Sequence, residues 1–216
     1  MAALPALRLY TSNGSPFCLK VMVLARELNI IDKIDLDYSV KAMPTSSTTS
    51  HSHLVPHGKI PALAIGTNGN ACDTVIYGSE NICAYLDTLA GNKALPPHGT
   101  LKRFEALTTE ALASAMCDAA LALRYERVER PQELHWQPWI DGQLSKVVRS
   151  IPVLAKRPLP DPKAEVFGIA AAIALWYMDK RARDSNWREL EGGKKLNEWL
   201  LQVQERPSWK ETPFVK

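Results

Sequence analysis

The feature that most constrains the fold is a change of hydrophobic spacing near the start of the chain. In residues 7–11, LRLYT, apolar and polar side chains alternate as in a strand, and from Pro16 onward the apolar side chains recur at helical intervals. Alternation returns in residues 34–40, IDLDYSV. This order predicts a β-α-β unit and therefore an α/β domain at the start of the chain.

The next segments extend this domain. Residues 41–58 are rich in Ser, Thr, His and Pro, which predicts a long irregular connection or a short, poorly formed helix. Residues 59–65, a Gly- and Asn-rich turn at 66–70 and residues 73–78 predict a hairpin. Ser79 is expected to cap a following helix. The first half is thus predicted to be β-α-β followed by β-β-α.

The second half has a different character. Gly and Pro break the pattern at 90–99, which predicts a linker between a domain at 1–89 and one at 100–216. Beyond the linker no strand pattern occurs, and the second domain is predicted to be an all-α helical bundle. Its helices are expected at 101–130, at 136–154, at 164–181 (apolar almost all round, hence central to the core) and around 196–203.

Composition narrows the classes of partner. The 26 Lys and Arg residues against 23 Asp and Glu are scattered along the chain, which argues against a nucleic-acid surface. The longest apolar run, residues 166–178, is shorter than the roughly 20 residues of a membrane span, and residues 1–10 lack the pattern of a secretory signal. The four cysteines form no C-x-x-C pair, which favours reduced thiols. We therefore expect a soluble, cytoplasmic protein without nucleic-acid or membrane partners.

The junction TSNGSPFC, residues 11–18, is the first candidate for chemistry. Ser15 before Pro16 is typical of a helix start, and the simplest interpretation is that Ser15 only caps this helix. A helix N-terminus also binds anions. If the anion is a thiolate, lowering a thiol pKa from about 8.5 to about 6.5 takes roughly 2.7 kcal/mol. The helix end supplies about 0.3–1 kcal/mol, so a hydroxyl that hydrogen-bonds the sulfur is needed beside it.

Five stretches of the sequence resemble motifs of one protein family. SPFCLKVMVLARELNI, VPHGKIPALAI and YGSENICAYLDTL resemble the thioredoxin-like amino-terminal half of cytosolic glutathione S-transferases. FGIAAAIALWYMDKR and LNEWLLQVQERPSWKETPF resemble the helical carboxy-terminal half, and the motifs occur in the family order across nearly the whole chain. The resemblance implies glutathione as cosubstrate, no metal, a homodimer, and a role in detoxification or secondary metabolism.

The resemblance also implies the glutathione contacts. The Ser15 hydroxyl would hold the glutathione sulfur as a thiolate, with Ser12 as the second candidate. Ile60 would pair with the cysteinyl unit through its backbone, before a cis bond to Pro61. Ser79 would bind the γ-glutamyl carboxylate, and Lys59 would face the glycyl carboxylate or lie in solvent. The full glutathione-binding set is Ser15, Phe17, Lys59, Ile60, Pro61, Ser79 and Glu80.

A second substrate is expected to be small, hydrophobic and electrophilic. The family places it between the first turn and the first long helix of the second domain. Its expected lining residues are Asn13, Phe17, Met116, Ala120 and Arg124.

The chain departs from the family pattern at three places. Gly78 stands where many members carry an acidic residue or glutamine, so the ammonium group of glutathione lacks a partner unless Glu80 or a second subunit supplies one. Val55 replaces the usual asparagine of an N-P-x-G-K stretch. Residues 165–168, EVFG, replace a Ser/Thr-x-x-Asp capping box, whose loss lowers stability by about 1 kcal/mol.

Several alternatives stay open at this point. The same site suits a glutathione-dependent double-bond isomerase, which does not consume glutathione, and Gly78 keeps open a non-catalytic ligand-binding or regulatory protein. A dithiol oxidoreductase is disfavoured because Ser15 replaces the attacking cysteine of a C-P-F-C site, leaving Cys18 to be a packed hydrophobe or a redox group. A metal site at His51, His53 and His57 is disfavoured because Pro56 prevents one continuous helix through them.

Overall fold

The computed structural model describes residues 5–46, 50–66, 74–160 and 165–214. These residues form two compact units. One contains the described residues up to Pro96 together with 211–214, and the other contains the described residues of Pro97–Lys210. Most of the turn predicted at 66–70, and Cys72 as well, lie outside the described residues.

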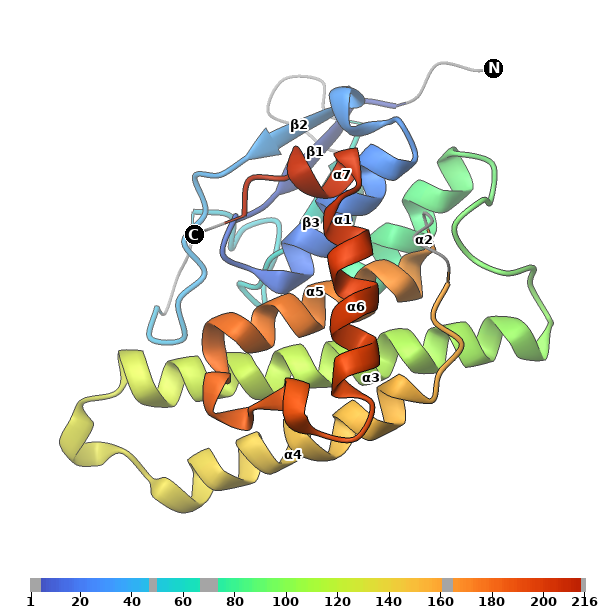
Figure 1. Ribbon diagram of the computed structural model, residues 1–216. Helices are drawn as coiled ribbons and strands as arrows, with labels where there is room; N and C mark the ends of the chain where they lie inside the picture. Colours follow the sequence, from blue (N-terminus) through green and yellow to red (C-terminus); the bar gives the residue numbers. More distant parts are fainter. Residues whose placement is uncertain (1–4, 47–49, 67–73, 161–164, 215–216) are drawn as a thin grey trace. The chain divides into compact units, whose positions relative to one another are not determined.

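The first unit is an α/β arrangement around one sheet. Its elements are β1 (Leu7–Tyr10), α1 (Pro16–Glu27), the 3-10 turn η1 (Ile31–Lys33), β2 (Ile34–Asp37), β3 (Ala62–Ile65), β4 (Thr74–Tyr77) and α2 (Ser79–Leu89). The strand order is β2-β1-β3-β4, and Figure 1 labels β2, β1 and β3. β1 and β2 pair in parallel, whereas β3 is antiparallel to both of its neighbours. The predicted order, β-α-β followed by β-β-α, is confirmed.

Burial explains why these segments take these forms. Alternation in β1 turns Leu7 and Leu9 inward, and both are buried. α1 and α2 pack against each other, and α2 also contacts β3 and β4. The apolar side chains of the strands and both helices together form the core of this unit: Leu9, Leu19, Met22, Leu24, Leu63, Ile82 and Leu86 are fully buried.

The second strand is shorter than the sequence predicts. β2 ends at Asp37 rather than at Val40. The Asp37 Oδ1 atom accepts hydrogen bonds from the backbone N–H of Ser39 at 2.8 Å and from its hydroxyl at 2.6 Å. This local turn satisfies the Ser39 backbone without a neighbouring strand and so ends the ladder.

The second unit contains only helices and turns among its described residues. Its elements are α3 (Leu101–Arg124), the π-helical turn η2 (Tyr125–Glu129), η3 (Gln132–Leu134), α4 (Gln137–Ala155), α5 (Val166–Arg181), η4 (Arg183–Ser185), η5 (Trp187–Glu189), α6 (Gly193–Gln204) and α7 (Pro207–Lys210). α3 packs along α4 and α5, and α6 contacts both α4 and α5. α5 is buried on nearly every side, as its apolar sequence predicts.

The first long helix ends earlier than predicted. The α-helical part of residues 101–130 stops at Arg124, and the wider turn η2 follows. The Glu126 carboxylate holds the connection to α4, because it accepts hydrogen bonds from the Trp136 backbone N–H and from Arg130 Nε, both at 2.8 Å. These bonds hold a buried carboxylate within the turn and fix the path of the segment that leads from α3 back to α4.

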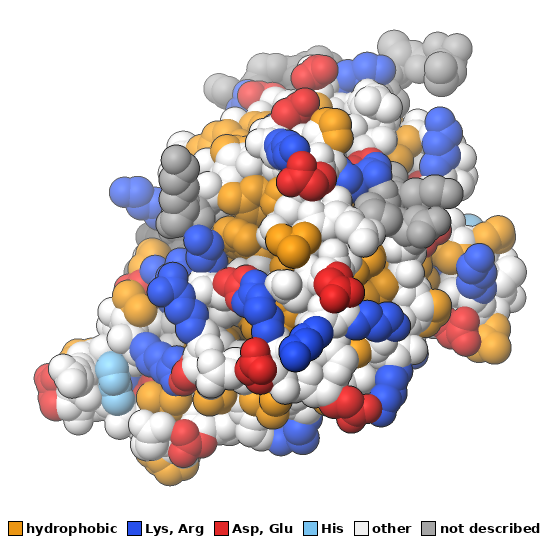
Figure 2. All heavy atoms as spheres, viewed as in Figure 1, with side chains coloured by type: hydrophobic (Ala, Val, Ile, Leu, Met, Phe, Trp, Pro, Cys, Tyr) orange, Lys and Arg blue, Asp and Glu red, His pale blue; other side chains and the backbone are white. Residues whose placement is uncertain are grey.

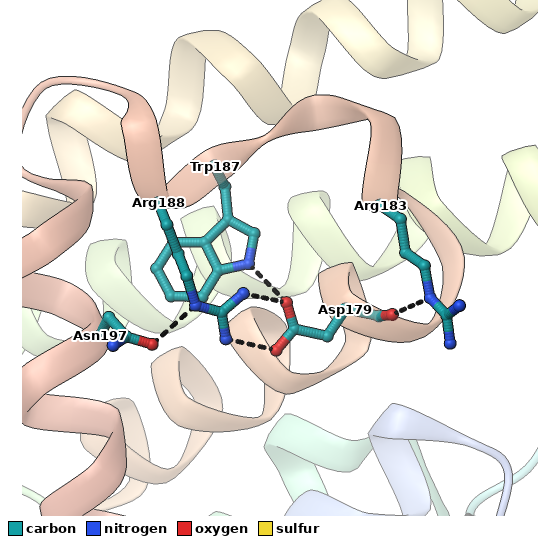
Figure 3. A network of polar contacts seen from close by, with 5 residues as sticks. All are labelled: Asp179, Arg183, Trp187, Arg188 and Asn197. Atoms are coloured by element: carbon teal, nitrogen blue, oxygen red, sulfur yellow. Dashed lines mark hydrogen bonds and ion pairs between the residues drawn. The ribbon is translucent and has the colours of Figure 1, made fainter.

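The region from α5 to α6 is held by one aspartate. Figure 3 shows Asp179 Oδ1 accepting hydrogen bonds from Trp187 Nε1 at 2.8 Å and from Arg188 Nη1 at 2.6 Å. Arg188 Nη2 donates to Asp179 Oδ2 at 2.8 Å, and the guanidinium lies 4.3 Å from the Trp187 ring centroid. The indole of Trp187 is 2% exposed, so its N–H has a buried acceptor. The turns η4 and η5 were not predicted from the sequence.

The start of α5 lacks a side-chain cap, as the residues 165–168 indicate. Glu165 occupies the N-cap position and its side chain accepts no capping hydrogen bond. Gly168 has another role there: a Cβ at this position would lie 2.5 Å from Cγ of Pro160. The Pro160 carbonyl in turn accepts a hydrogen bond from Trp199 Nε1 at 2.9 Å. Glycine therefore allows the segment after α4 to approach α5.

Charges of both signs are mixed on the face that Figure 2 draws, and the most apolar long helix among the described residues packs inside the second unit. Figure 2 shows basic and acidic side chains interspersed over the face that it draws. By length and composition alone, Leu101–Glu129 is the one helix among the described residues that could cross a membrane. Half of its most apolar window is buried inside the protein, and α3 packs along α4 and α5. These contacts are those of a core helix.

Candidate active site

The turn between β1 and α1 presents two serine hydroxyls. Thr11 is buried, and its backbone N–H donates to the Asp37 carbonyl at 2.9 Å. Ser12 Oγ accepts from the Gly14 backbone N–H at 3.3 Å, and the Ser15 N–H donates to the Ser12 carbonyl at 3.3 Å. Ser12 and Ser15 are both partly exposed. This tight turn therefore places both hydroxyls at the beginning of α1.

Ser15 is the N-cap of α1, as predicted. Its backbone is extended, with φ −92° and ψ 120°, and its Oγ accepts from the Cys18 backbone N–H at 3.4 Å. This capping bond is long, and it uses the oxygen of Ser15 only as an acceptor. A hydroxyl that accepts in this way still has a hydrogen to donate. Ser15 can therefore cap the helix and, when its hydrogen turns away from the Cys18 sulfur, donate to an anion at the same time.

Cys18 is a packed thiol rather than a reactive one. Its side chain is fully buried, and burial raises the pKa of the thiol to about 11. Hydrogen bonding from the hydroxyls of Ser15 and Thr11 acts in the opposite direction but does not outweigh burial. A thiolate is the reactive form of cysteine, so Cys18 has little reactivity near neutral pH.

The sheet register brings three candidate segments to the same end of the strands. Tyr10, the last residue of β1, pairs with Ala62, the first residue of β3, and Ala62 pairs with Tyr77, the last residue of β4. The residues just beyond this row are the β1–α1 turn, the Ile60–Pro61 peptide and the start of α2. Antiparallel pairing thus gathers segments that lie far apart in the sequence.

The Ile60–Pro61 peptide bond is cis, as the resemblance implies. Within the described part of the chain, the backbone of Ile60 makes no hydrogen bond to another backbone group. A segment with an unpaired backbone next to a strand can receive a peptide as an added strand. Lys59 is exposed, so its side chain is open to solvent or to a ligand.

Two of the three clustered histidines support this segment. The Lys59 backbone N–H donates to His57 Nδ1 at 3.1 Å, and His51 Nε2 lies 3.5 Å from the Lys59 carbonyl. His51 is buried, and burial lowers its pKa. No group of three metal-ligating side chains occurs among the described residues. The sequence indicated that these histidines lie close together, but their role in holding Lys59 was missed because it depends on the path of the loop.

The start of α2 differs from the prediction by one residue. The cap position belongs to Gly78, with φ +81°, and Ser79 is the first helical residue rather than the N-cap. A Cβ at Gly78 would lie 2.6 Å from Glu80 Oε1. The Glu80 carboxylate therefore occupies space that a larger residue 78 would take. Ser79 Oγ donates to Glu80 Oε2 at 3.5 Å, which brings hydroxyl and carboxylate together at the helix N-terminus.

The residues predicted to line the second-substrate site belong to both units. Asn13 lies in the β1–α1 turn, where its Oδ1 is buried without a hydrogen-bond partner, and Phe17 is half-buried on α1. In the second unit, Met116 and Ala120 are buried on α3. Arg124 is partly exposed and pairs with Glu129 at 2.6 Å. Their role in binding a second substrate stays a prediction.

Comparison with known proteins identifies similar chains. Residues 9–94 match the family model described as glutathione S-transferase, N-terminal domain. A glutathione transferase family member from Pseudomonas fluorescens Pf-5, solved with bound glutathione, is 33% identical, with a TM-score of 0.87 over 97% of this chain and 100% of that chain. A structure from the same organism with bound S-(propanoic acid)-glutathione is 32% identical, with a TM-score of 0.83 and the same coverage.

A third structure extends the likeness to another organism. The glutathione S-transferase from Methylobacillus flagellatus KT, with glutathione bound, is 27% identical, with a TM-score of 0.80 over 97% of this chain and 100% of that chain. No curated protein matches the chain significantly. These likenesses confirm the predicted fold class, a thioredoxin-like domain followed by a helical one.

Proposed function

The chain belongs to the glutathione transferase family, and from this premise we propose that it joins glutathione to a hydrophobic electrophile, with Ser15 stabilising the thiolate. The observation that carries the proposal is the register of the sheet. Tyr10, Ala62 and Tyr77 form one row, and the Ser15 turn, the Ile60–Pro61 peptide and the α2 N-terminus lie just beyond it. One tripeptide can therefore contact all three segments.

Each segment suits a different part of glutathione. The Ser15 hydroxyl and the N-terminus of α1 face the sulfur, where a donor and a positive helix end stabilise a thiolate. The free backbone of Ile60 pairs with the cysteinyl unit. The N-terminus of α2, with Ser79, binds the γ-glutamyl carboxylate. Phe17 and Lys59 contribute further contacts, and Ser12 is the second candidate for the sulfur.

Glu80 replaces the acidic partner that is absent at position 78. Its carboxylate lies beside the Gly78 backbone, in the space where a side chain at that position would begin. A carboxylate there is available to the ammonium group of the γ-glutamyl unit, which accounts for Gly78 without loss of glutathione binding. Gly78 is thus compatible with an active enzyme.

The proposed reaction is the addition of the thiolate to the substrate. The glutathione thiol releases its proton to solvent, and the thiolate sulfur forms a bond to an electrophilic carbon. Either a halide ion departs from that carbon, or the sulfur adds to an activated double bond and the second carbon takes up a proton from solvent. S-(propanoic acid)-glutathione in the Pseudomonas structure is a thioether of this kind, which supports conjugation in this chain.

The test combines binding with product mass. Calorimetry with glutathione is expected to show binding, and the product with an activated aryl halide is expected to have the mass of the substrate plus glutathione minus hydrogen halide. With a conjugated double-bond substrate, an isomerase would give a product of unchanged mass and altered geometry. Absence of glutathione binding at millimolar concentration would contradict the enzyme function and favour a non-catalytic role.

We also propose a cytoplasmic location and a homodimer. The four cysteines form no C-x-x-C pair and no disulfide-scaffold spacing in the sequence, which suits a reducing compartment. The homodimer is supported by the family resemblance. Sedimentation equilibrium of the purified protein measures its mass in solution and so tests the dimer.

A further inference from the structure

The loop at residues 51–59, called the His57 loop below, is built from turns rather than from a strand. The Val55 backbone N–H donates to the His51 carbonyl at 2.8 Å, and the Gly58 N–H donates to the Val55 carbonyl at 2.9 Å. β3 begins only at Ala62, so no neighbouring strand holds the end of this loop or Ile60 after it. Contacts outside the sheet ladder therefore have to fix this segment.

One such contact is made by His57. Its Nδ1 atom accepts a hydrogen bond from the backbone N–H of Lys59 at 3.1 Å. Asn and Asp side chains close the same kind of turn, because they accept from the backbone two residues further along the chain. Gly58 lies between the two residues with φ +65°, a left-handed backbone that glycine adopts without strain. His57 thus takes the place of Asn or Asp in this turn.

Tyr77 attaches the His57 loop to the sheet. Its hydroxyl donates to the Leu54 carbonyl at 2.7 Å, and its ring meets the His57 ring edge-on, with 5.0 Å between the ring centroids. Tyr77 is the last residue of β4 and directly precedes Gly78, the N-cap of α2. The loop is therefore attached to the strand that leads into the N-terminus of α2.

The carbonyl of Lys59 also has a neighbour inside the unit. His51 Nε2 lies 3.5 Å from this carbonyl oxygen, and the buried His51 ring lies 5.7 Å from the Tyr10 ring between centroids. Both backbone polar groups of Lys59 thus face histidine side chains. Ile60 differs, because across the described ranges its backbone makes no hydrogen bond to another backbone group. The N–H and C=O of Ile60 are therefore available to a ligand.

We propose that His57 is a positioning residue for glutathione. By closing the turn at Lys59 it holds the backbone of the next residue, Ile60, ready to pair with the cysteinyl unit. The inference rests on the proposed binding of glutathione and adds a residue that acts through the backbone of its neighbours. A segment that already has its bound conformation loses less conformational entropy when the ligand binds, which raises affinity.

The test compares two replacements of nearly the same size and shape. Asparagine offers an acceptor oxygen two residues before the Lys59 N–H, as an Asx turn requires, whereas leucine offers a methyl group. Both replacements remove the ring contact with Tyr77, so the difference between His57→Asn and His57→Leu reports the hydrogen bond to Lys59. His57 is exposed, so both variants are expected to fold, and thermal unfolding checks this. His53→Leu is the matched control, because His53 is an exposed histidine of the same loop.

The first measurement uses the protein without ligand. Hydrogen exchange of the Lys59 amide, followed by NMR, should be about three- to tenfold faster in His57→Leu than in the wild type, which is the effect of losing one net hydrogen bond. The exchange rate in His57→Asn and in His53→Leu should stay close to that of the wild type.

The second measurement is the affinity for glutathione. The Kd from calorimetry should rise about three- to tenfold in His57→Leu and return toward the wild-type value in His57→Asn. With a neutral aryl halide, the KM for glutathione should rise in His57→Leu, whereas kcat at saturating glutathione should change little because Ser15 is untouched. A loss confined to KM is the signature of positioning rather than of thiolate stabilisation.

The outcomes separate this inference from the proposed function. Absence of glutathione binding in the wild type would overturn both. Wild-type binding with the same Kd in His57→Leu and His57→Asn would overturn the positioning role alone, and so would an equal loss in His53→Leu. An unchanged exchange rate of the Lys59 amide in His57→Leu would overturn it whether or not glutathione binds.

Discussion

Replacing Ser15 by alanine separates the structural role of this residue from its chemical role. The structural loss is the capping bond to the Cys18 N–H, which is 3.4 Å long. Loss of an N-cap costs about 0.5–2 kcal/mol, and a long bond belongs at the low end of that range. The variant is therefore expected to fold, with a small decrease in the free energy of unfolding measured in urea.

The loss of thiolate stabilisation in Ser15→Ala is larger than the loss of folding stability, and its effect on the rate depends on pH. A charge-assisted hydrogen bond from the hydroxyl contributes about 1.5–3 kcal/mol, and one pKa unit corresponds to about 1.36 kcal/mol. Ser15→Ala should therefore raise the pKa of the bound glutathione thiol by about 1–2 units. The remaining stabilisation of the thiolate comes from the end of α1, at about 0.3–1 kcal/mol.

The direction of the pH effect in Ser15→Ala follows because the thiolate of glutathione, not the thiol, reacts. Below both thiol pKa values, kcat/KM should fall by about 10- to 100-fold in Ser15→Ala, because the thiolate fraction falls by that factor. Above both values the thiol is ionised in either protein, and the two rates should converge. Glutathione affinity by calorimetry should change little, because the other contacts remain.

The assay is the pH profile of kcat/KM with a neutral aryl halide, accompanied by the ultraviolet absorbance of the thiolate. Ser12→Ala is the matched control, since Ser12 lies in the same turn and caps no helix. A loss of the same size at every pH would refute a role in thiol ionisation. A displaced profile in Ser12→Ala but not in Ser15→Ala would assign the sulfur contact to Ser12.

Three further predictions follow from the described contacts. Ser15→Cys creates C-P-F-C and should give the protein thiol-disulfide exchange with a glutathione mixed disulfide. The wild type is expected to show less of this activity, because burial raises the pKa of its Cys18 thiol to about 11. No gain would mean that Cys18 is too deeply buried to act as the second thiol. Asp179→Ala should lower the free energy of unfolding in urea by about 1–3 kcal/mol, because the buried Trp187 N–H loses its acceptor. Asp179→Asn keeps an acceptor and should cost less, so equal losses would contradict this reasoning. Burial lowers the folded pKa of His51 below 6.5, so the unfolded chain binds its proton first, and stability should decrease as pH falls through about 6.5. His51→Phe should flatten this part of the stability profile, and an unchanged slope would exclude His51 as its source.

Local chemistry made the first turn predictable from sequence. Ser15 followed by Pro16 carries its helix-start signal in adjacent residues, and the structure places the cap there. The start of α2 was less predictable, because its cap depends on the backbone of Gly78 at φ +81°. Serine is a frequent N-cap, so the sequence pointed to Ser79, one residue too late. The proximity of Glu80 to Gly78 could be found only once that backbone was known.

The second unit shows a different limit of prediction from sequence. The apolar run of α5 predicted its central place, but the same run concealed Tyr177 as one more buried side chain. The burial of its hydroxyl depends on how α3 and α5 pack, and packing between helices leaves no periodic signal in the sequence. The ends of β2 and α3 were likewise set by individual side chains, Asp37 and Glu126, which act on the backbone around them.

The row formed by Tyr10, Ala62 and Tyr77 ties the proposed glutathione contacts to the hydrophobic interior. Adding or deleting a single residue within β3 would turn Leu63 away from the core and, in the same step, move Pro61 out of line with its neighbours. A lineage of such proteins therefore cannot lose the alignment of its binding groups by strand slippage and still keep a well-packed domain. Changes of specificity are accordingly free to accumulate in side chains, while the spacing of the three strands stays fixed.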